Sequence, residues 1–216
     1  MKSYAVIGLG RFGTRLARML SSLGNEVLAI DVDKAVVDDI ADHVTRAVAA
    51  DAKDKDVLKG LGVPECDVAV VAMGGDLASS VLITMNLKTL GCKEVIAKAY
   101  DETHREILEK LGADSVIIPE QTVADKLAHT LNSSNVLEYI ELSPDYGIVE
   151  YKTPAPWVGK TVRELNIRAK YQVNLIAAKA GEKITVSPTA DYRPEADDTL
   201  VMLGEYKALD RIKRIK

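Results

Sequence analysis

The sequence is poor in cysteine and has no long apolar run, and these shortages exclude several classes of protein. Its two cysteines, Cys66 and Cys92, lie in no CxxC pattern and beside no pair of histidines. They predict packing residues, with neither a disulfide framework nor a metal-binding finger. No stretch approaches the roughly 20 apolar residues of a membrane span. Because Met1 is followed by no signal-peptide pattern, we expect a cytoplasmic protein.

A surplus of positive charge is also missing. The 28 lysines and arginines are outnumbered by 32 aspartates and glutamates, which gives a formal net charge of -4 and a pI near 5.5. A chain of this charge has little electrostatic drive to neutralise nucleic-acid phosphates. Aromatic residues make up only 5% of the chain, and no aromatic RNA-binding signature or helix-turn-helix appears. We therefore expect no nucleic-acid partner.

Short β-branched runs alternate with longer helical patterns from Tyr4 to about Asn132. This alternation is typical of βαβ units and predicts an α/β protein with a Rossmann-type, doubly wound parallel sheet. The predicted strands are residues 4–7, 26–30, 46–49, 68–72, 94–97 and 115–118. The predicted helices are residues 11–23, 34–41, 55–61, 77–90, 102–111 and 121–131.

The pattern changes after Asn132, where two apolar runs flank a Ser-Pro-Asp-Tyr-Gly turn and predict a β-hairpin of residues 136–142 and 148–152. We expect one domain in residues 1–132 and a small α+β domain in residues 133–216, with residues 132–135 as the linker. In the second domain we predict a short helix at 161–165 and strands at 173–179 and 200–203. A core of about 80 residues is marginal, so this domain should pack against a copy of itself or another domain.

A glycine-rich segment, GLGRFG at residues 8–13, follows the first predicted strand and opens the first predicted helix. In that position a GxGxxG pattern indicates a bound phosphate group, because the helix start offers free amides to an anion. We assign Gly8 to the tight turn, Gly10 to the close approach of a pyrophosphate, and Gly13 to the packing of helix on strand. A glycine turn without a ligand is the alternative.

Three aspartates follow the second and third predicted strands. Asp31 has the spacing at which a carboxylate accepts hydrogen bonds from the ribose hydroxyls of adenosine, and it would repel a 2'-phosphate, which disfavours NADP. Asp33 lies in the turn before a helix, where it either contacts the ribose or caps the helix. Asp51 either faces the adenine or ribose or is a solvated loop carboxylate.

Lys98 and Glu120 follow the fifth and sixth predicted strands and should lie near the same crevice. Arg11 and Lys98 can each neutralise a phosphate, whereas Glu120 beside a polyphosphate requires a bridging cation such as Mg²⁺. This combination suggests a γ-phosphate with a metal ion held by Glu120. The alternatives are a surface lysine at position 98 and, at position 120, an acid that stabilises the start of a helix.

Groups for catalysis are scarce. The three histidines, His43, His104 and His129, lie in the first domain, and residues 133–216 contain neither histidine nor cysteine. A dehydrogenase needs an acid-base group beside its nicotinamide. The sequence also has no nucleophile elbow, zinc signature or Walker loop. We therefore expect a protein that binds its ligand without turning it over.

These residues together resemble the potassium-conductance-regulating (RCK) subunits of the Ktr and Trk uptake systems, which consist of TrkA-N and TrkA-C domains. The likeness in the first half rests on residues 4–13, 50–52, 70–74, 98, 112–114 and 119–120, and in the second half on residues 158–161, 165–171, 174–177 and 198–200. Two positions depart from the family pattern. Ala50 stands where many relatives carry glycine, and Tyr100 where some carry histidine.

The resemblance implies a cytoplasmic regulatory subunit, peripheral to the cell membrane, that exchanges ATP and ADP and gates a membrane-embedded, potassium-translocating subunit. It also implies dimers that assemble into a homo-octameric ring. The implied nucleotide site consists of Gly8, Gly10, Arg11, Phe12, Gly13, Asp31, Asp33, Asp51, Ala52, Ala72, Met73, Gly74, Lys98 and Glu120. Within it, Arg11 and Glu120 would distinguish a γ-phosphate with its cation.

The second domain resembles the family module that, in several Gram-positive relatives, binds cyclic di-AMP between two copies. Arg168, Asn174 and Pro188 fall at matching positions. An arginine can bind a phosphate and an asparagine an adenine edge, although Arg168 has the alternative of a purely structural role.

An NAD(H)-binding module is the main rival interpretation. The glycine-rich segment and Asp31 suit NAD as well as they suit ATP. Such a module would be a redox sensor or a small oxidoreductase. A preference for NADH or NAD over ATP would mark the sensor, and hydride transfer the oxidoreductase.

Overall fold

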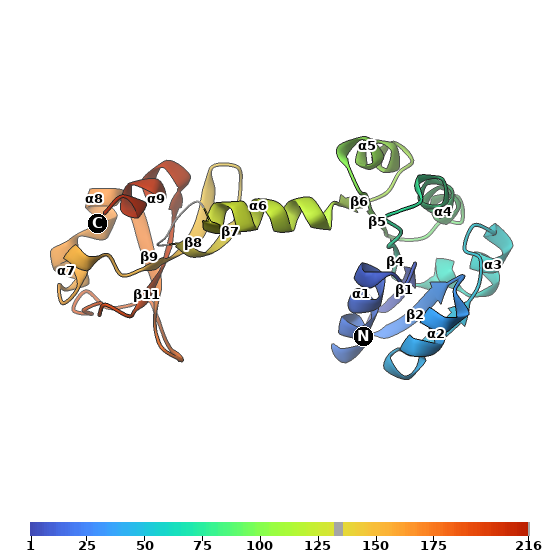
Figure 1. Ribbon diagram of the computed structural model, residues 1–216, viewed down its shortest axis with the longest axis horizontal. Helices are drawn as coiled ribbons and strands as arrows, with labels where there is room; N and C mark the ends of the chain where they lie inside the picture. Colours follow the sequence, from blue (N-terminus) through green and yellow to red (C-terminus); the bar gives the residue numbers. More distant parts are fainter. Residues whose placement is uncertain (132–135, 216) are drawn as a thin grey trace. The chain divides into compact units, whose positions relative to one another are not determined.

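The chain forms two compact units, Met1–Gln121 and Thr122–Lys216, in the computed structural model (Figure 1). The structure describes residues 1–131 and 136–215, so the expected linker at 132–135 lies outside the described residues. Within the described ranges, no helix combines the length and the apolar character that crossing a membrane requires.

The first unit is built on a six-stranded sheet with the order β3-β2-β1-β4-β5-β6, in which each pair of neighbours is parallel. The chain reverses its direction of travel across the sheet between β1 and β4, which makes the sheet doubly wound and confirms the Rossmann-type prediction. The strands are β1 (Ser3–Ile7), β2 (Glu26–Asp31), β3 (Arg46–Ala49), β4 (Val68–Val71), β5 (Val95–Lys98) and β6 (Ser115–Ile117).

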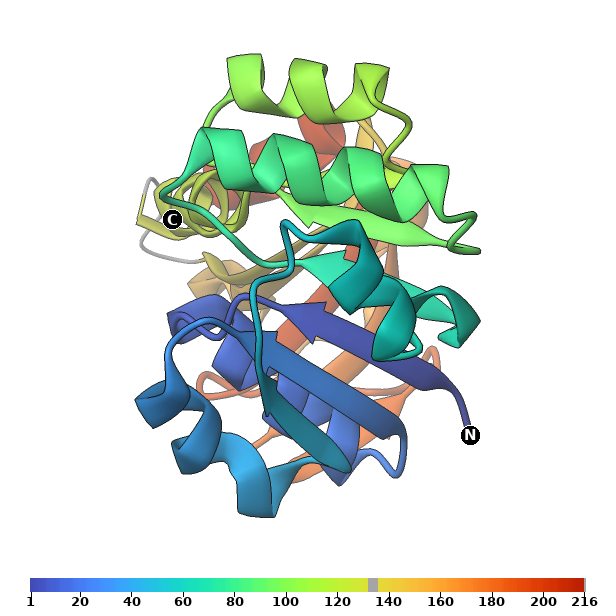
Figure 2. The same cartoon turned by 90° about the vertical axis from the view of Figure 1, so that its right-hand side faces the viewer.

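Helices cover both faces of the parallel sheet (Figure 2). On one face α1 and α2 bury Ala17 and Ile40 against β2. On the other face α3, α4 and α5 bury Leu58, Leu87 and Leu108. These elements are α1 (Arg11–Ser22), α2 (Lys34–Ile40), η1 (Ala41–His43), α3 (Lys55–Gly60), η2 (Val63–Glu65), α4 (Leu77–Thr89) and α5 (Glu102–Lys110). Near-continuous apolar strands are required here because the sheet is covered on both sides.

The helices of the first unit begin in two different ways. Helices α2 to α5 each start after an aspartate whose carboxylate accepts a hydrogen bond from an amide of the first turn; these N-caps are Asp33, Asp54, Asp76 and Asp101. Helix α1 starts after Gly10, which supplies no side-chain cap. Aspartate is a favourable N-cap because it satisfies amides that have no partner within the helix.

Two boundaries affect the site and differ from the prediction. Lys98 is the last residue of β5, and α6 (Pro119–Leu131) begins two residues earlier than expected, which places Glu120 in its first turn. Proline suits the first helical position because the amide there needs no partner within the helix. The other ends of strands and helices in the first unit agree with the prediction to within one residue.

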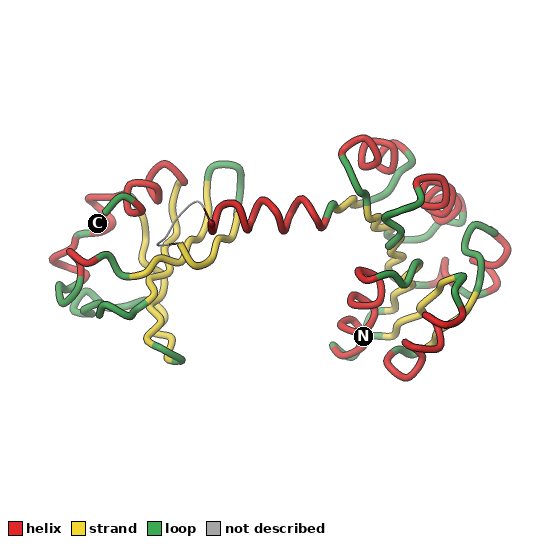
Figure 3. The backbone as a smooth tube through the Cα atoms, in the orientation of Figure 1, coloured by secondary structure: helices red, strands yellow, loops and turns green. Residues whose placement is uncertain are grey.

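The second unit contains a five-stranded antiparallel sheet in the order β10-β9-β11-β8-β7 (Figure 3). Strands β7 and β8 form the predicted hairpin. The core gathers Trp157, Leu200, Met202 and Leu209 between the sheet and its helices. The elements are β7 (Val136–Glu141), β8 (Tyr146–Lys152), η3 (Ala155–Trp157), α7 (Val162–Leu165), α8 (Ile167–Tyr171), β9 (Val173–Ala180), β10 (Lys183–Val186), β11 (Thr199–Glu205) and α9 (Tyr206–Lys213).

Besides the single turn of η3, the sequence analysis missed three elements of the second unit. Helix α8 has five residues and strand β10 has four, which is too short for a hydrophobic period to show. Helix α9 had a signal, because Leu209 and Ile212 are buried at helical spacing between charged residues. With these elements, the unit is the small α+β body expected for the second half.

Asp67 joins the amino ends of three strands in the first unit. Its carboxylate accepts hydrogen bonds from the amide and hydroxyl of Ser3, at 3.0 and 3.2 Å, and forms an ion pair of 2.8 Å with Lys93. These bonds, with that to Lys93 first, lower the pKa of Asp67 from 3.8 to about 2. The ionised carboxylate is therefore the form that the folded state favours.

Asp67→Asn should lower the free energy of unfolding at neutral pH, since the amide keeps the shape but loses the charge. Because the pKa is depressed in the folded state, the advantage of the wild type is fully present above pH 3.8 and should shrink as the pH falls toward 2. Urea unfolding of both proteins between pH 7 and pH 2.5 measures this. A difference that stays constant over the acid range would contradict it.

Candidate functional site

The glycine-rich turn between β1 and α1 is held by close backbone contacts. Gly8 has a φ of +92°, and a Cβ placed there would lie 2.9 Å from Cγ of Met73. A Cβ on Gly13 would lie 1.9 Å from the carbonyl oxygen of Gly8. Both positions require glycine for the fold itself, because an added methyl has no room.

Gly10 differs from the other two glycines of the turn. It has an ordinary φ of -65°, and a Cβ built on it meets no atom within 4 Å. The fold therefore does not require glycine at this position. The open space in front of Gly10 lies at the uncapped start of α1, where first-turn amides are available to an anion.

Asp31 braces the glycine-rich turn from the end of β2. Its Oδ2 accepts a hydrogen bond of 2.6 Å from the amide of Leu9, and its Oδ1 accepts one of 2.9 Å from the amide of Asp33. The side chain remains half-buried, and each carboxylate oxygen can accept a further bond. Asp31 thus fixes the turn and can still accept a bond from a ligand hydroxyl.

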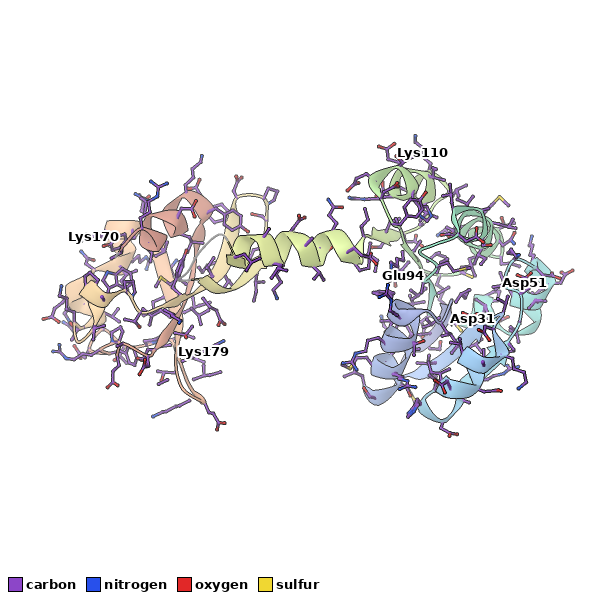
Figure 4. All side chains as sticks on the ribbon, in the orientation of Figure 1. Asp31, Asp51, Glu94, Lys110, Lys170 and Lys179 are labelled. Atoms are coloured by element: carbon purple, nitrogen blue, oxygen red, sulfur yellow. The ribbon has the colours of Figure 1, made fainter. Side chains whose placement is uncertain are left out.

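A cavity opens beside the turn at the carboxyl ends of β1 to β4 (Figure 4, in which Asp31 and Asp51 are labelled). It combines an apolar wall with several polar groups at the rim. Its lining consists of Ile7, Gly8, Ile30, Asp31, Val32, Ala50, Asp51, Ala52, Lys53, Met73, Asp76, Ser79 and Ile83. A crevice outside the carboxyl ends of parallel strands, where the strand order reverses, is the usual ligand position in such sheets.

The remaining two aspartates of the prediction have different positions. Asp51 lines the cavity, where its carboxylate accepts a hydrogen bond of 3.0 Å from the amide of Lys53 and pairs with its ammonium at 3.5 Å. Asp33 is absent from the lining and caps α2, accepting a bond of 2.9 Å from the amide of Ala35. The cap that sequence analysis left open for Asp33 is therefore formed.

A second, charged cluster gathers at the ends of β1, β4, β5 and β6. The ammonium of Lys98 forms an ion pair of 2.7 Å with Oε1 of Glu120 and lies 5.7 Å from the centroid of the Phe12 ring. The hydrogen bond from Lys98 is the main cause of a lowered pKa of Glu120, and the charge of Arg11 adds to it. A Cβ on Gly74 would come within 3.0 Å of the Lys98 ammonium.

This charged cluster holds one carboxylate. Among the described residues, no group of three or more histidine, cysteine, aspartate or glutamate side chains is arranged to hold a metal ion. Mg²⁺ is commonly held by one or two carboxylates together with substrate phosphates. Glu120 therefore fits a cation only when phosphate oxygens complete the coordination.

Three other candidates for chemistry have structural roles. Cys92 is buried and Cys66 half-buried, and burial raises the pKa of both thiols. His104 is buried, its Nε2 lies 3.2 Å from the Ser80 hydroxyl, and burial lowers its pKa. All three are away from the cavity lining.

A further cavity lies in the second unit between α7, α8 and the start of β9. It is lined by Val162, Arg163, Asn166, Ile167, Arg168, Val173, Asn174 and Leu175. Arg168 and Asn174 both line this cavity, whereas Pro188, which the family resemblance groups with them, is not part of the lining. Asn166 has a φ of +45°, a left-handed conformation that asparagine tolerates better than most residues.

Comparison with known proteins decides the family. Residues 4–119 match the TrkA-N domain and residues 148–216 match the TrkA-C domain. The chain is 39% identical over 213 residues to the Ktr system potassium uptake protein C of Bacillus subtilis (strain 168), covering 99% of this chain and 96% of that protein. It is 38% identical over 212 residues to the Ktr system potassium uptake protein A of the same organism, with coverage of 98% and 96%.

The chain belongs to the Ktr family of potassium uptake proteins. The resemblance inferred from its motifs is thereby confirmed. Among solved structures, a GsuK channel bound to NAD superposes with a TM-score of 0.70 at 17% identity, over 99% of this chain and 39% of that chain. This structural likeness supports the fold alone.

Sequence analysis of this Ktr family member missed Asp76 and Ser79 in the first cavity. Asp76 caps α4 and accepts bonds from the amide and hydroxyl of Ser79, at 3.1 and 2.6 Å, which lower its pKa. An aspartate three residues before a serine, at the start of a predicted helix, was the available signal. It also missed Arg163 and Asn166, which line the second cavity.

Gly13→Ala should destabilise the first unit by about 2 kcal/mol or more, since overpacking against backbone leaves no relief. Gly10→Ala should change the free energy of unfolding by no more than about 0.5 kcal/mol, as at an unconstrained surface position. Chemical unfolding of the two variants beside the wild type provides the measurement. Equal losses would show that the backbone contact of Gly13 with Gly8 is not what holds α1.

Proposed function

We propose that this Ktr family member is the cytosolic regulatory subunit of a membrane-embedded, potassium-translocating protein and that it senses ATP and ADP on its first unit. The observation that carries the proposal is a site in two parts. An apolar cavity rimmed by Asp31 and Asp51 adjoins the glycine-rich turn, and a cluster of two cations with Glu120 lies at the strands beyond β1. The first part suits adenosine, and the second suits the terminal phosphates.

Adenosine recognition follows from the chemistry of the cavity. Asp31 and Asp51 offer carboxylate oxygens to ribose hydroxyls, while Ile30, Met73 and Ile83 offer apolar surface to the adenine ring. The pyrophosphate would then lie at Gly10 and the first turn of α1.

Discrimination between ATP and ADP would come from the charged cluster. Arg11 and Lys98 attract a γ-phosphate, and Glu120 contributes a carboxylate to a cation that the γ-phosphate also binds. ADP lacks the oxygens that would complete this coordination. Because only differential contact shifts an equilibrium, a coupling of about 1 to 3 kcal/mol between nucleotide and conformation would bias the channel.

Exposed apolar residues suited to self-association lie on α4 of the first unit and on α6, most of which belongs to the second unit. Leu77, Leu82 and Met85 of α4 are exposed. Val123, Leu127 and Leu131 of α6 are exposed at intervals of four residues and form an apolar stripe. Exposed apolar stripes support the association of copies of the chain. From the resemblance to the Ktr family we further propose dimers that assemble into an octameric ring beneath the channel.

An NAD(H)-binding module remains the alternative, either a redox sensor or a small oxidoreductase, because Asp31 and the glycine-rich turn suit NAD as well. The charged cluster favours ATP, since the ion pair of Lys98 with Glu120 would find no γ-phosphate on NAD. The absence of histidine and cysteine from residues 133–216 supports a role without catalysis.

Purified protein should bind ATP and ADP more tightly than NAD or NADH in a calorimetric titration, with a divalent cation strengthening ATP binding more than ADP binding. Gly10→Ala should weaken ATP binding about tenfold, because its methyl occupies the space in which a pyrophosphate approaches. Gly60→Ala, which also meets no atom within 4 Å, is the matched control.

The mass of the same samples in solution tests the ring. A clear preference for NADH over ATP, or hydride transfer to any substrate, would replace this proposal with the redox alternative. A monomer at micromolar concentration would refute the assembly without affecting nucleotide binding.

The second unit supports a further ligand, a cyclic dinucleotide of the cyclic di-AMP type, in the cavity that holds Arg168 and Asn174. An arginine that binds a phosphate and an asparagine that binds an adenine edge are the groups such a ligand requires.

Arg168→Ala should reduce cyclic di-AMP binding at least tenfold, since charged hydrogen bonds contribute about 1.5 to 3 kcal/mol. Arg214→Ala, an exposed arginine of the same unit, is the control. Titration of cyclic di-AMP into the full chain measures the effect. Unchanged affinity in Arg168→Ala would remove this cavity as the site.

A further inference from the structure

The ion pair between Lys98 and Glu120 is strongly asymmetric in its surroundings. The side chain of Lys98 is 12% exposed, whereas that of Glu120 is 66% exposed. The lysine ammonium lies 5.7 Å from the centroid of the Phe12 ring, and the end of its chain fills the space beside Gly74. The cation is therefore the fixed partner, and the carboxylate is the one that solvent and ligands can reach.

Gly74 has a specific part in fixing Lys98. A Cβ at this position would lie 3.0 Å from Nζ, 3.2 Å from Cε and 3.5 Å from Cδ of the lysine. Gly74 does not have a positive φ, so its backbone does not require glycine. The small residue instead leaves room for the lysine to extend to Glu120.

A cation that needs the carboxylate of Glu120 must therefore compete with a lysine already bound to it. An ammonium 2.7 Å from Oε1 already neutralises the carboxylate charge that would attract a divalent cation. The competition ends when another anion draws the ammonium away. Of the two adenine nucleotides, ATP alone brings a γ-phosphate into this region.

We propose that Lys98 is a tethered counter-ion that occupies Glu120 until a γ-phosphate attracts its ammonium, so that this lysine makes cation binding at Glu120 depend on ATP. The proposal rests on the nucleotide-sensing function above. With ADP bound, Lys98 stays on Glu120 and the carboxylate does not bind the cation. With ATP bound, the ammonium moves to the γ-phosphate and the carboxylate becomes a ligand.

The test is a double-mutant cycle on Mn²⁺ binding, measured by electron paramagnetic resonance on the full chain with stoichiometric ATP or ADP. In the wild type, Glu120→Gln should weaken Mn²⁺ binding to the ATP complex. It should change the Mn²⁺ affinity of the ADP complex by less than about twofold, because Lys98 already occupies the carboxylate. In the Lys98→Met background, Glu120→Gln should weaken Mn²⁺ binding to the ADP complex about fivefold, which is the upper effect of an exposed charge pair.

Two variants control the cycle. Gly74→Ala keeps the lysine charge but places a methyl group where the lysine chain lies. In this background too, Glu120→Gln should therefore weaken Mn²⁺ binding to the ADP complex. Lys93→Met removes another lysine with an ion pair of 2.8 Å, to Asp67 at the opposite ends of the strands, and should leave the cycle as in the wild type. Thermal unfolding verifies that each variant is folded.

The outcomes separate this inference from the proposed function. If Glu120→Gln affects the ADP complex equally with and without Lys98, the lysine does not compete for the carboxylate and the inference is wrong. If Lys98→Met only weakens ATP binding, the lysine is an ordinary phosphate ligand. If the wild type binds neither nucleotide, or if Glu120→Gln leaves the ATP complex unchanged, the nucleotide-sensing function itself fails.

Discussion

The contact of Gly13 with the carbonyl of Gly8 determines how α1 packs against the parallel sheet. Because a methyl group at Gly13 would lie 1.9 Å from that oxygen, the helix approaches the turn as closely as a backbone can. This approach directs the first-turn amides of α1 toward the open space at Gly10, and Asp31 holds the turn there through the amide of Leu9. The cavity and the charged cluster both lie around this turn.

The fold of the first unit could be predicted because its signals are local and repeated. Six short apolar runs separated by helical patterns leave few topologies open, and the glycine-rich turn marks the edge at which ligands bind in such sheets. The second unit was harder, since α8 and β10 are shorter than the period that would reveal them. Their conformations are set by contacts with distant strands.

Some residues of the candidate site could likewise be predicted from the sequence, and others could not. The turn and Asp31 were predictable from spacing. Asp33 and Asp76 both cap helices, and of these two Asp76 also lines the cavity, a difference that spacing does not show. The ion pair of Lys98 with Glu120 joins residues 22 positions apart on neighbouring segments. Sequence analysis placed both near phosphates, but it had no means of showing that they bind each other.

The N-caps of the first unit have a consequence for where an anion can settle. At α2, α3, α4 and α5 an aspartate already fills the positive end of the helix dipole with a negative charge. Among these five helices, α1 is the one that begins at a glycine and keeps that end open. A polyphosphate bound as proposed would therefore be guided to its position partly by exclusion, since the starts of α2 to α5 would repel it while the start of α1 would attract it.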